Sequence, residues 1–128
     1  MSGTDLVLPS VALTAFQASC TRTDERLEVK LTGTADVAAL EELQRLFGAV
    51  HVEAQRAKAK QVVVDLKALG FMNSSCFKTF ITWLTAVREL EGGAQYRIGF
   101  RSNPAQHWQR RSLAALSGFG GELVWIES

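Results

Sequence analysis

Residues 71–76, Phe-Met-Asn-Ser-Ser-Cys, place two hydroxyls and a thiol between an apolar run at 62–66 and an amphipathic segment at 77–90. The run predicts a buried strand and the segment a helix, so these polar side chains lie at a helix N-terminus. Backbone N–H groups and the helix dipole favour negative charge there. A phosphoryl group on one of these serines would therefore be well placed to switch the binding of a partner.

Each of these side chains also has a simpler interpretation. Ser74 or Ser75 can cap the helix by accepting a hydrogen bond from an orphan N–H, and Ser75 is the weaker phosphorylation candidate because it could turn inward. A helix N-terminus lowers the pKa of a thiol. Cys76, however, has no base near it in the sequence, since His51 and His107 lie in other predicted helices. We interpret Cys76 as a small buried packing residue.

Other polar residues show no catalytic or metal-binding pattern. Asp36 directly precedes a predicted helix and is interpreted as its cap, and Asp65 as a hydrogen-bonding partner of the loop after its strand. No group of His, Cys and Asp has the spacing of metal ligands. The glycines at 118–121 do not connect a strand to a helix, so no phosphate-binding loop or other cofactor site is predicted. The basic and aromatic run at 107–111 is interpreted as a solvated helix face.

The composition predicts one globular domain. Of 128 residues, 47% are hydrophobic and 21% charged, and the net charge is +1. The chain can therefore form a core, and its charge does not favour nucleic acid or anionic membranes. Two cysteines make no disulfide framework, which favours reduced thiols and a cytoplasmic location. Residues 1–10 are expected to be a flexible leader and residues 11–128 the domain.

Strands and helices are expected to alternate along the domain. Strands are predicted at 11–21, 26–32, 61–66, 96–100 and 123–126, with a hairpin turn at 23–25. Helices are predicted at 37–58, from 74 or 75 to before Gly92, and at 105–116, where Pro104 opens the helix. This order predicts an α/β fold with a mixed sheet of four or five strands and helices mainly on one face.

Three segments in this order resemble the STAS domain family, which is named for sulphate transporters and anti-sigma-factor antagonists. Residues 31–36, Leu-Thr-Gly-Thr-Ala-Asp, are similar to the turn before the first helix of the family. Residues 62–66, Val-Val-Val-Asp-Leu, followed by 71–75, are similar to its strand and phosphorylation loop. Residues 116–119, Leu-Ser-Gly-Phe, are similar to the segment after its third helix. The resemblance covers residues 11–127.

The resemblance implies a regulatory binding protein of a partner-switching circuit, and not an enzyme. A serine kinase related to anti-sigma factors would phosphorylate the loop, and a metal-dependent serine phosphatase would reverse the modification. The position that matches the usual target is Ser74. Two residues depart from the family pattern: Asn73 replaces an aspartate and Cys76 a glycine. The residues expected to contact the partner are Asn73, Ser74, Ser75, Lys78, Thr79, Thr82, Gly33 and Asp36.

Other functions are left open by the sequence. The domain could be an unphosphorylated scaffold or an oligomerising subunit of a signalling complex, because Asn73 lacks the acidic charge. An enzyme with Cys76 or Ser74 as nucleophile lacks a neighbouring general base. A small apolar ligand or a lipid has no specific feature in its favour. The sequence also does not decide whether Trp83 points outward, where it would mark a docking face with Lys78, Thr79 and Thr82 on the outer side.

Overall fold

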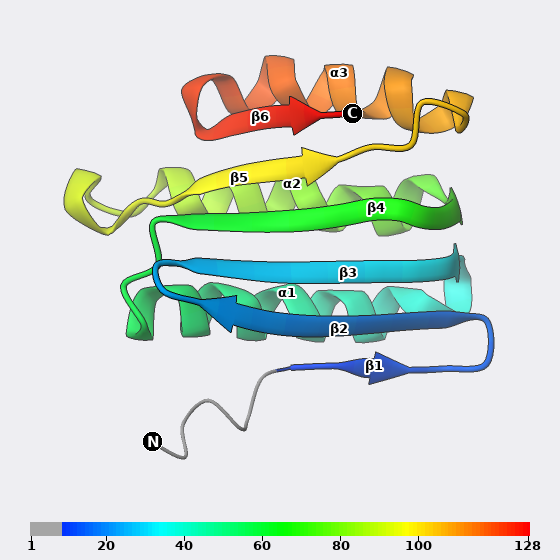
Figure 1. The fold of residues 1–128 in the computed structure, drawn as a ribbon, viewed down its shortest axis with the longest axis horizontal. Helices are drawn as coiled ribbons and strands as arrows, with labels where there is room; N and C mark the ends of the chain where they lie inside the picture. The colour runs from blue at the N-terminus through cyan, green and yellow to red at the C-terminus, as the bar shows by residue number, and fades with distance from the viewer. Residues whose placement is uncertain (1–8) are drawn as a thin grey trace.

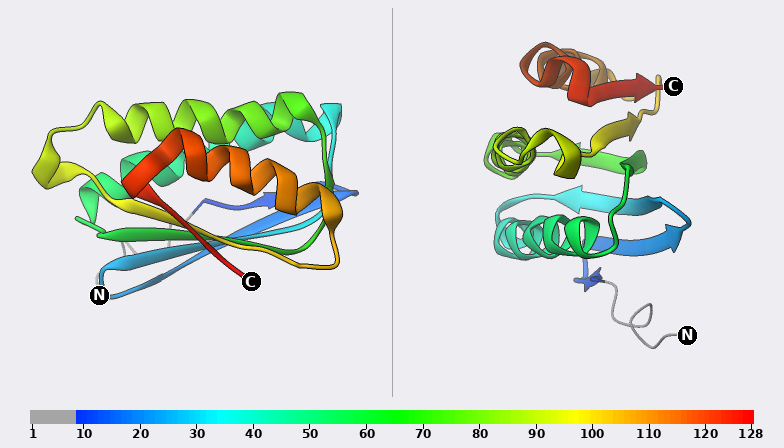
Figure 2. Two further views of the ribbon diagram at one scale, coloured as in Figure 1. Left: turned by 90° about the horizontal axis from the view of Figure 1, so that it is seen from above. Right: turned by 90° about the vertical axis from the view of Figure 1, so that its left-hand side faces the viewer.

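The structure is a computed structural model that describes residues 9–128, so most of the expected leader at 1–10 lies outside the described residues. A six-stranded mixed sheet carries three helices on one face (Figure 1, Figure 2). The strands are β1 (Val11–Ala12), β2 (Phe16–Thr23), β3 (Arg26–Ala35), β4 (Gln61–Met72), β5 (Arg97–Arg101) and β6 (Val124–Glu127). The helices are α1 (Val37–Arg56), α2 (Ser74–Arg88) and α3 (His107–Gly120), with short 3-10 turns at Gly92–Ala94 and Gly121–Leu123. The α/β class and the helices on one face are confirmed.

The strands lie in the sheet in chain order, from β1 to β6. β1, β2 and β3 are antiparallel neighbours, whereas β3, β4, β5 and β6 run parallel. Parallel neighbours need a crossover connection. Here each crossover is a helix, so α1 joins β3 to β4, α2 joins β4 to β5, and α3 joins β5 to β6. β4 is therefore a central strand, and α2 is the middle helix of the layer (Figure 1).

The core lies between the sheet and the helices. In β3 the apolar residues Leu27, Val29 and Leu31 are buried and the charged residues between them face the other side, as their alternation predicts. α1 and α2 turn their apolar stripes to the sheet. The helix-free face of the parallel strands is covered by long polar side chains. There Arg101 bonds Glu28 and Glu127, while Trp125 lies over Gly99, where an added Cβ would come within 2.3 Å of the indole.

Several element boundaries differ from the sequence expectation. The sheet has six strands rather than four or five. The expected first strand is two strands, because a turn in which Leu13 N donates to Phe16 O interrupts it. α3 begins at His107, since the Asn103 side chain accepts from Ala105 N and holds the segment around Pro104 in a turn. α3 continues through Gly118 and ends where Gly121 adopts φ +57°.

β3 and β4 are both longer than expected, and their extra residues build the edge at which α2 begins. β4 runs to Met72 and pairs with β3 as far as Ala35, with irregular register at two points. Gly33 has φ +98°, and a Cβ there would lie 2.2 Å from Ala15 O, so only glycine fits this close approach. Asn73 N then donates to Ala35 O at 2.9 Å. The ends of β3 and β4 therefore bring the starts of α1 and α2 side by side.

Candidate functional site

The N-terminus of α2 is capped by Asn73 rather than by a serine. Asn73 Oδ1 accepts from Cys76 N at 2.8 Å, and Asn73 has the extended backbone typical of a cap. Ser74 and Ser75 are the first two residues of the helix, and both are exposed. The expectation that Ser75 turns inward is wrong. Both hydroxyls are therefore free of the capping role that was their simpler interpretation.

Cys76 joins the starts of α1 and α2. Its side chain is fully buried, and Sγ donates to Asp36 O at 3.2 Å. Burial raises the pKa of the Cys76 thiol, and the Asp36 carboxylate raises it further. A thiol with a raised pKa is a weak nucleophile at neutral pH. The interpretation as a packing residue is confirmed, and Cys76 holds the two helix N-termini together.

Of the residues predicted to contact a partner, some are exposed and others are partly or fully buried. Asp36 caps α1, with Oδ1 accepting from Ala38 N at 3.1 Å, and lies at the same edge as the serine loop. Lys78 and Thr82 are exposed on α2, as expected. Thr79 is only 7% exposed, so its expected place on the outer side is wrong. Gly33 shapes the end of β3 and is half-buried.

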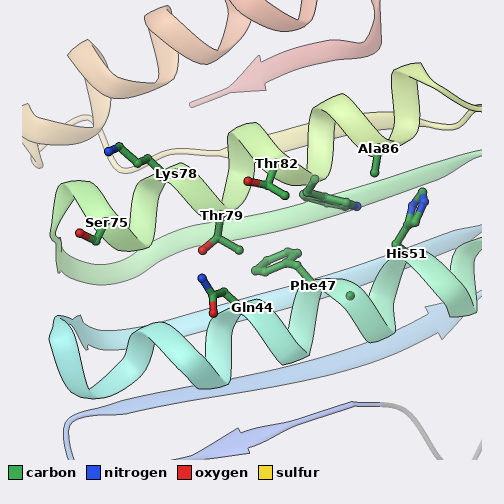
Figure 3. Close-up of a pocket in the computed structure, with 10 residues that line it drawn as sticks. Gln44, Phe47, His51, Ser75, Lys78, Thr79, Thr82 and Ala86 are labelled. Atoms are coloured by element: carbon green, nitrogen blue, oxygen red, sulfur yellow. The ribbon is translucent and has the colours of Figure 1, made fainter.

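A groove of about 340 Å³ runs between α1 and α2 (Figure 3). Its lining comes from one face of each helix: Gln44, Phe47, Gly48, His51, Ser75, Lys78, Thr79, Thr82, Trp83 and Ala86. The rings of Phe47 and Trp83 lie 4.7 Å apart, measured between centroids. The small residues Gly48 and Ala86 leave space beside these rings. Sequence analysis did not find this groove, because its two walls are about 30 residues apart in the chain.

Trp83 points inward, which settles the orientation that the sequence left open. It is 3% exposed, and its Nε1 donates to Tyr96 Oη at 2.8 Å. Tyr96 Oη also lies 2.6 Å from His51 Nδ1. Since the indole only donates, the proton of Tyr96 Oη is available to His51 Nδ1, and this arrangement requires the imidazole proton on Nε2. Burial lowers the pKa of His51 and raises that of Tyr96, so both groups are neutral at pH 7.

The remaining candidates have structural roles. Asp65 Oδ1 accepts from Lys67 N at 2.9 Å within β4, so it bonds the backbone as expected but in mid-strand. Trp108, in the basic and aromatic run, donates to Gly70 O at 3.0 Å. Within residues 9–128 no group of three or more His, Cys, Asp or Glu side chains could hold a metal ion. In the same part of the chain, none of the helices is both long enough and apolar enough to cross a membrane.

Solved structures with the same arrangement exist, although no protein-family model and no curated protein matches the sequence. An anti-sigma factor antagonist from Mycobacterium paratuberculosis superposes with TM-score 0.66 at 17% identity, over 91% of this chain and 88% of that one. The anti-sigma factor antagonist SpoIIAA in its unphosphorylated form gives TM-score 0.57 at 24% identity, over 89% and 88%. The phosphorylated form of SpoIIAA, described as a Bacillus cell fate determinant, gives 0.56 at 23%, over 89% and 92%.

This chain has the fold of the anti-sigma-factor antagonists. The fold implied by the STAS resemblance is thereby confirmed, over nearly the whole of the described chain. The structural neighbours are regulatory proteins by name, and two of them are the same protein with and without phosphate.

Proposed function

We propose that this chain is a cytoplasmic protein-binding module of a partner-switching circuit, and that phosphorylation of Ser74 controls its binding. The observation that carries the proposal is the position of Ser74, which is the exposed first residue of α2 and makes no cap because Asn73 does. The shared fold with anti-sigma-factor antagonists, one of them known in both phosphorylation states, supports the same conclusion.

A phosphate on Ser74 is compatible with the fold. The N–H groups of Ser74 and Ser75 belong to the first turn of α2 and have no intrahelical acceptor. Lys78 lies one helical turn after Ser74, so its ammonium is on the same face. A phosphate adds about −1.5 to −2 charges at pH 7 and three strong acceptor oxygens. The helix start accommodates that charge, whereas a partner surface that fits neutral serine does not, and the partner is released.

The proposed binding face consists of the half-buried Asn73 and the exposed residues around this helix start: Asp36, Ser74, Ser75, Lys78 and Thr82. Gly33 acts indirectly, because it sets the backbone of β3 next to Asp36. Thr79 is excluded from the face by its burial. The partner is a serine kinase of the anti-sigma-factor type, and a serine phosphatase restores the unmodified form.

Phosphopeptide mass spectrometry of the protein from its native cells tests the modification. The peptides must cover residues 68–88, which include Ser74 and Ser75. Phosphate on Ser74 supports the proposal. Complete coverage without phosphate under several growth conditions contradicts it and favours the unphosphorylated scaffold, for which the uncharged Asn73 beside Ser74 is the supporting feature.

Binding measurements test the switch itself. Partners captured by the unmodified chain are titrated with Ser74→Asp and Ser74→Ala, with Ser75→Asp as a control that adds the same charge one residue further on. We expect Ser74→Asp to weaken binding by at least about tenfold, Ser74→Ala to bind as the unmodified chain does, and Ser75→Asp to have a smaller effect. Equal affinity for all four proteins would show that no switch operates at this loop.

A further inference from the structure

β6 lies at the edge of the sheet, and in the part of the chain that the structure describes its outer side pairs with no strand. One bond fixes the direction of its backbone groups: Ser102 N, directly after β5, donates to Glu127 O at 2.7 Å. The backbone groups of successive residues in a strand point alternately to its two sides. Trp125 and Glu127 therefore point to β5, whereas the N–H and C=O of Ile126 point outward. Such unpaired groups are a template for another strand.

A groove of about 360 Å³ lies beside this edge, between β6 and α3. The accessible part of its lining consists of exposed or half-buried side chains: Asn103, Pro104, Arg110, Ala114, Ser117 and Ile126. Ile126 is 37% exposed, and its side chain is on the helix side of the sheet, because Trp125 before it lies on the other side over Gly99. The edge therefore offers an open apolar side chain and two outward backbone groups to the same neighbour.

α3 limits what can pair with this edge. In the face view and in the end view, α3 extends past β6 on the outer side of the sheet (Figure 1, Figure 2). Paired strands lie about 4.8 Å apart, whereas the axes of packed helices lie about 8–10 Å apart. Two copies joined edge to edge by a two-fold axis would therefore bring their α3 helices into the same space. The edge is open to a single extended segment, and the overhanging helix excludes a second copy of the folded domain.

The charge of the groove favours an acidic segment. Arg110 is the charged side chain among the residues that line it, and it forms no ion pair within residues 9–128. Arg110 is exposed in the first turn of α3, where the helix dipole favours an anion. The side chain of Asn103 is already bonded to backbone groups of Lys67 and Ala105. A carboxylate on the segment would gain a charge-assisted bond from Arg110, whereas a cation would be repelled.

We propose that the β6 edge and the α3 groove bind an extended segment of a partner protein, which adds to the sheet as an antiparallel strand. One residue of the segment exchanges both backbone hydrogen bonds with Ile126 and packs an aliphatic side chain against it. α3 begins near the C-terminal end of β6, so the carboxylate that meets Arg110 lies two residues earlier in the antiparallel segment (Figure 1). Ser74 does not line this groove, and binding here does not depend on its phosphorylation.

The test uses the acetylated and amidated peptide Thr-Glu-Thr-Val-Thr-Val-Thr on the full isotopically labelled chain. The control peptide is methylated on the nitrogen of its first valine, which removes the N–H directed at Ile126 and keeps every side chain. We expect saturable amide shifts, largest at 124–128 and Ala114, and an affinity at least about tenfold above that of the control. Equal affinity, or no saturable shift up to about 5 mM, overturns the proposal. Shifts of the same amides with protein concentration alone assign the edge to a second copy and also overturn it.

A proline at the edge gives the sharpest variant. Because the N–H of Ile126 points away from β5, Ile126→Pro removes no hydrogen bond of the sheet, and proline is accepted at such edge positions. Ile126→Val keeps the N–H and a branched side chain, so it is the matched control. We expect Ile126→Pro to weaken the peptide at least about tenfold and Ile126→Val to change its affinity less than about twofold. Equal affinity for both variants overturns the proposal, and the methylated peptide decides the same bond if Ile126→Pro does not fold.

Two arginines of α3 test the chemistry of the segment. Arg110 lines the groove, whereas Arg111 is exposed on the same helix and does not. A second peptide carries glutamine in place of glutamate. We expect the unmodified chain and Arg111→Gln to prefer the glutamate peptide at least about threefold, and Arg110→Gln to bind both peptides equally. An unchanged preference in Arg110→Gln contradicts the acidic partner and with it the proposal. Because none of these variants alters Ser74, their results are independent of the phosphorylation experiment.

Discussion

Gln109 and Thr79 are two polar side chains buried in the same helix layer, and they differ in whether their hydrogen bonds are made. Gln109, on α3, is fully buried, and its Nε2 donates to Leu66 O at 2.8 Å and Leu69 O at 3.0 Å. Its Oε1 accepts from Asn103 N at 2.8 Å. Thr79, on α2, is nearly as buried, and its Oγ1 makes no hydrogen bond to any group within residues 9–128.

The difference separates a buried polar group that stabilises the fold from one whose burial costs stability. Gln109 bonds two carbonyls in the irregular stretch of β4, where the register against β3 shifts. Its amide thereby connects α3 to the sheet. Within residues 9–128, the hydroxyl of Thr79 is buried and bonds no other group. Burial alone therefore does not identify the role of a polar residue, whereas the list of its partners does.

The largest effect is expected for Gln109→Leu. The substitution keeps the apolar part but leaves two carbonyls and one N–H buried without partners, so the free energy of unfolding should fall by about 3 kcal/mol or more. Urea unfolding followed by circular dichroism measures it. Gln106→Ala is the control, because Gln106 makes no side-chain cap bond, and it should change stability by less than about 0.5 kcal/mol. Similar losses in both variants would contradict the structural role of Gln109.

Tyr96→Phe tests an intermediate case, in which one buried hydroxyl serves two neighbours. Trp83 Nε1 loses its acceptor and is left buried, whereas the half-buried His51 can bond water. We expect a loss of about 2 kcal/mol in the free energy of unfolding, with a larger share from the indole than from the imidazole. His51→Gln should therefore cost less than Tyr96→Phe, and the reverse order would contradict this division.

Thr79→Val should raise the free energy of unfolding, whereas the two preceding substitutions should lower it. Valine has nearly the shape of threonine but lacks the hydroxyl, whose burial without a hydrogen bond is unfavourable. We therefore expect a gain of about 1 kcal/mol in the free energy of unfolding. Thr85→Val removes a hydroxyl that is bonded to Ile81 O and should not stabilise the protein by this mechanism. Thermal unfolding of the two variants side by side checks the comparison. A loss in Thr79→Val would show that its hydroxyl has a partner in solution.

The smallest effect is a pH dependence from His51. Burial lowers its pKa below the ordinary value of 6.5, so the unfolded chain takes up this proton at a higher pH than the folded chain does. The contribution of neutral His51 is complete above pH 6.5 and is lost as the pH falls through 6.5 toward the folded-state pKa. Unfolding titrations between about pH 7 and 5 should show this decrease, and His51→Gln should reduce it. Hydrogen bonds from Arg56 and Trp125 lower the pKa of Glu53 and of Glu127 below 4.5, so the stability that these carboxylates contribute is lost only below this pH window.

The sequence predicts the order of elements well, because the periodicity of β3, α1 and α2 is strong. It also predicts the start of α2 and the cap at Asp36, which depend on neighbouring residues only. It misses the extension of β4 to Met72, since Lys67, Ala68 and Gly70 interrupt the apolar run where β4 departs from regular pairing. The local sequence pattern predicts only local structure, whereas the last residues of β4 are held in the sheet by pairing with β3.

The two buried polar residues show why the site was harder to predict than the fold. Thr79 lies on the apolar stripe of α2, three residues after Cys76 and four before Trp83, and Gln109 lies on that of α3, four before Leu113. Their positions could have been found from helical spacing. Their partners could not, because Gln109 bonds residues about 40 positions away. The sequence thus identifies unusual core positions, and only the structure shows which of them is unsatisfied.

The order of the strands has a consequence for synthesis on the ribosome. Because β1 to β6 lie in the sheet in the order in which they are translated, each new strand is added at the edge of a sheet that already exists. No strand has to insert between two that are already paired, and each helix can cover its part of the sheet before the next strand emerges. The nascent domain can therefore grow from β1 toward β6 in the order of translation.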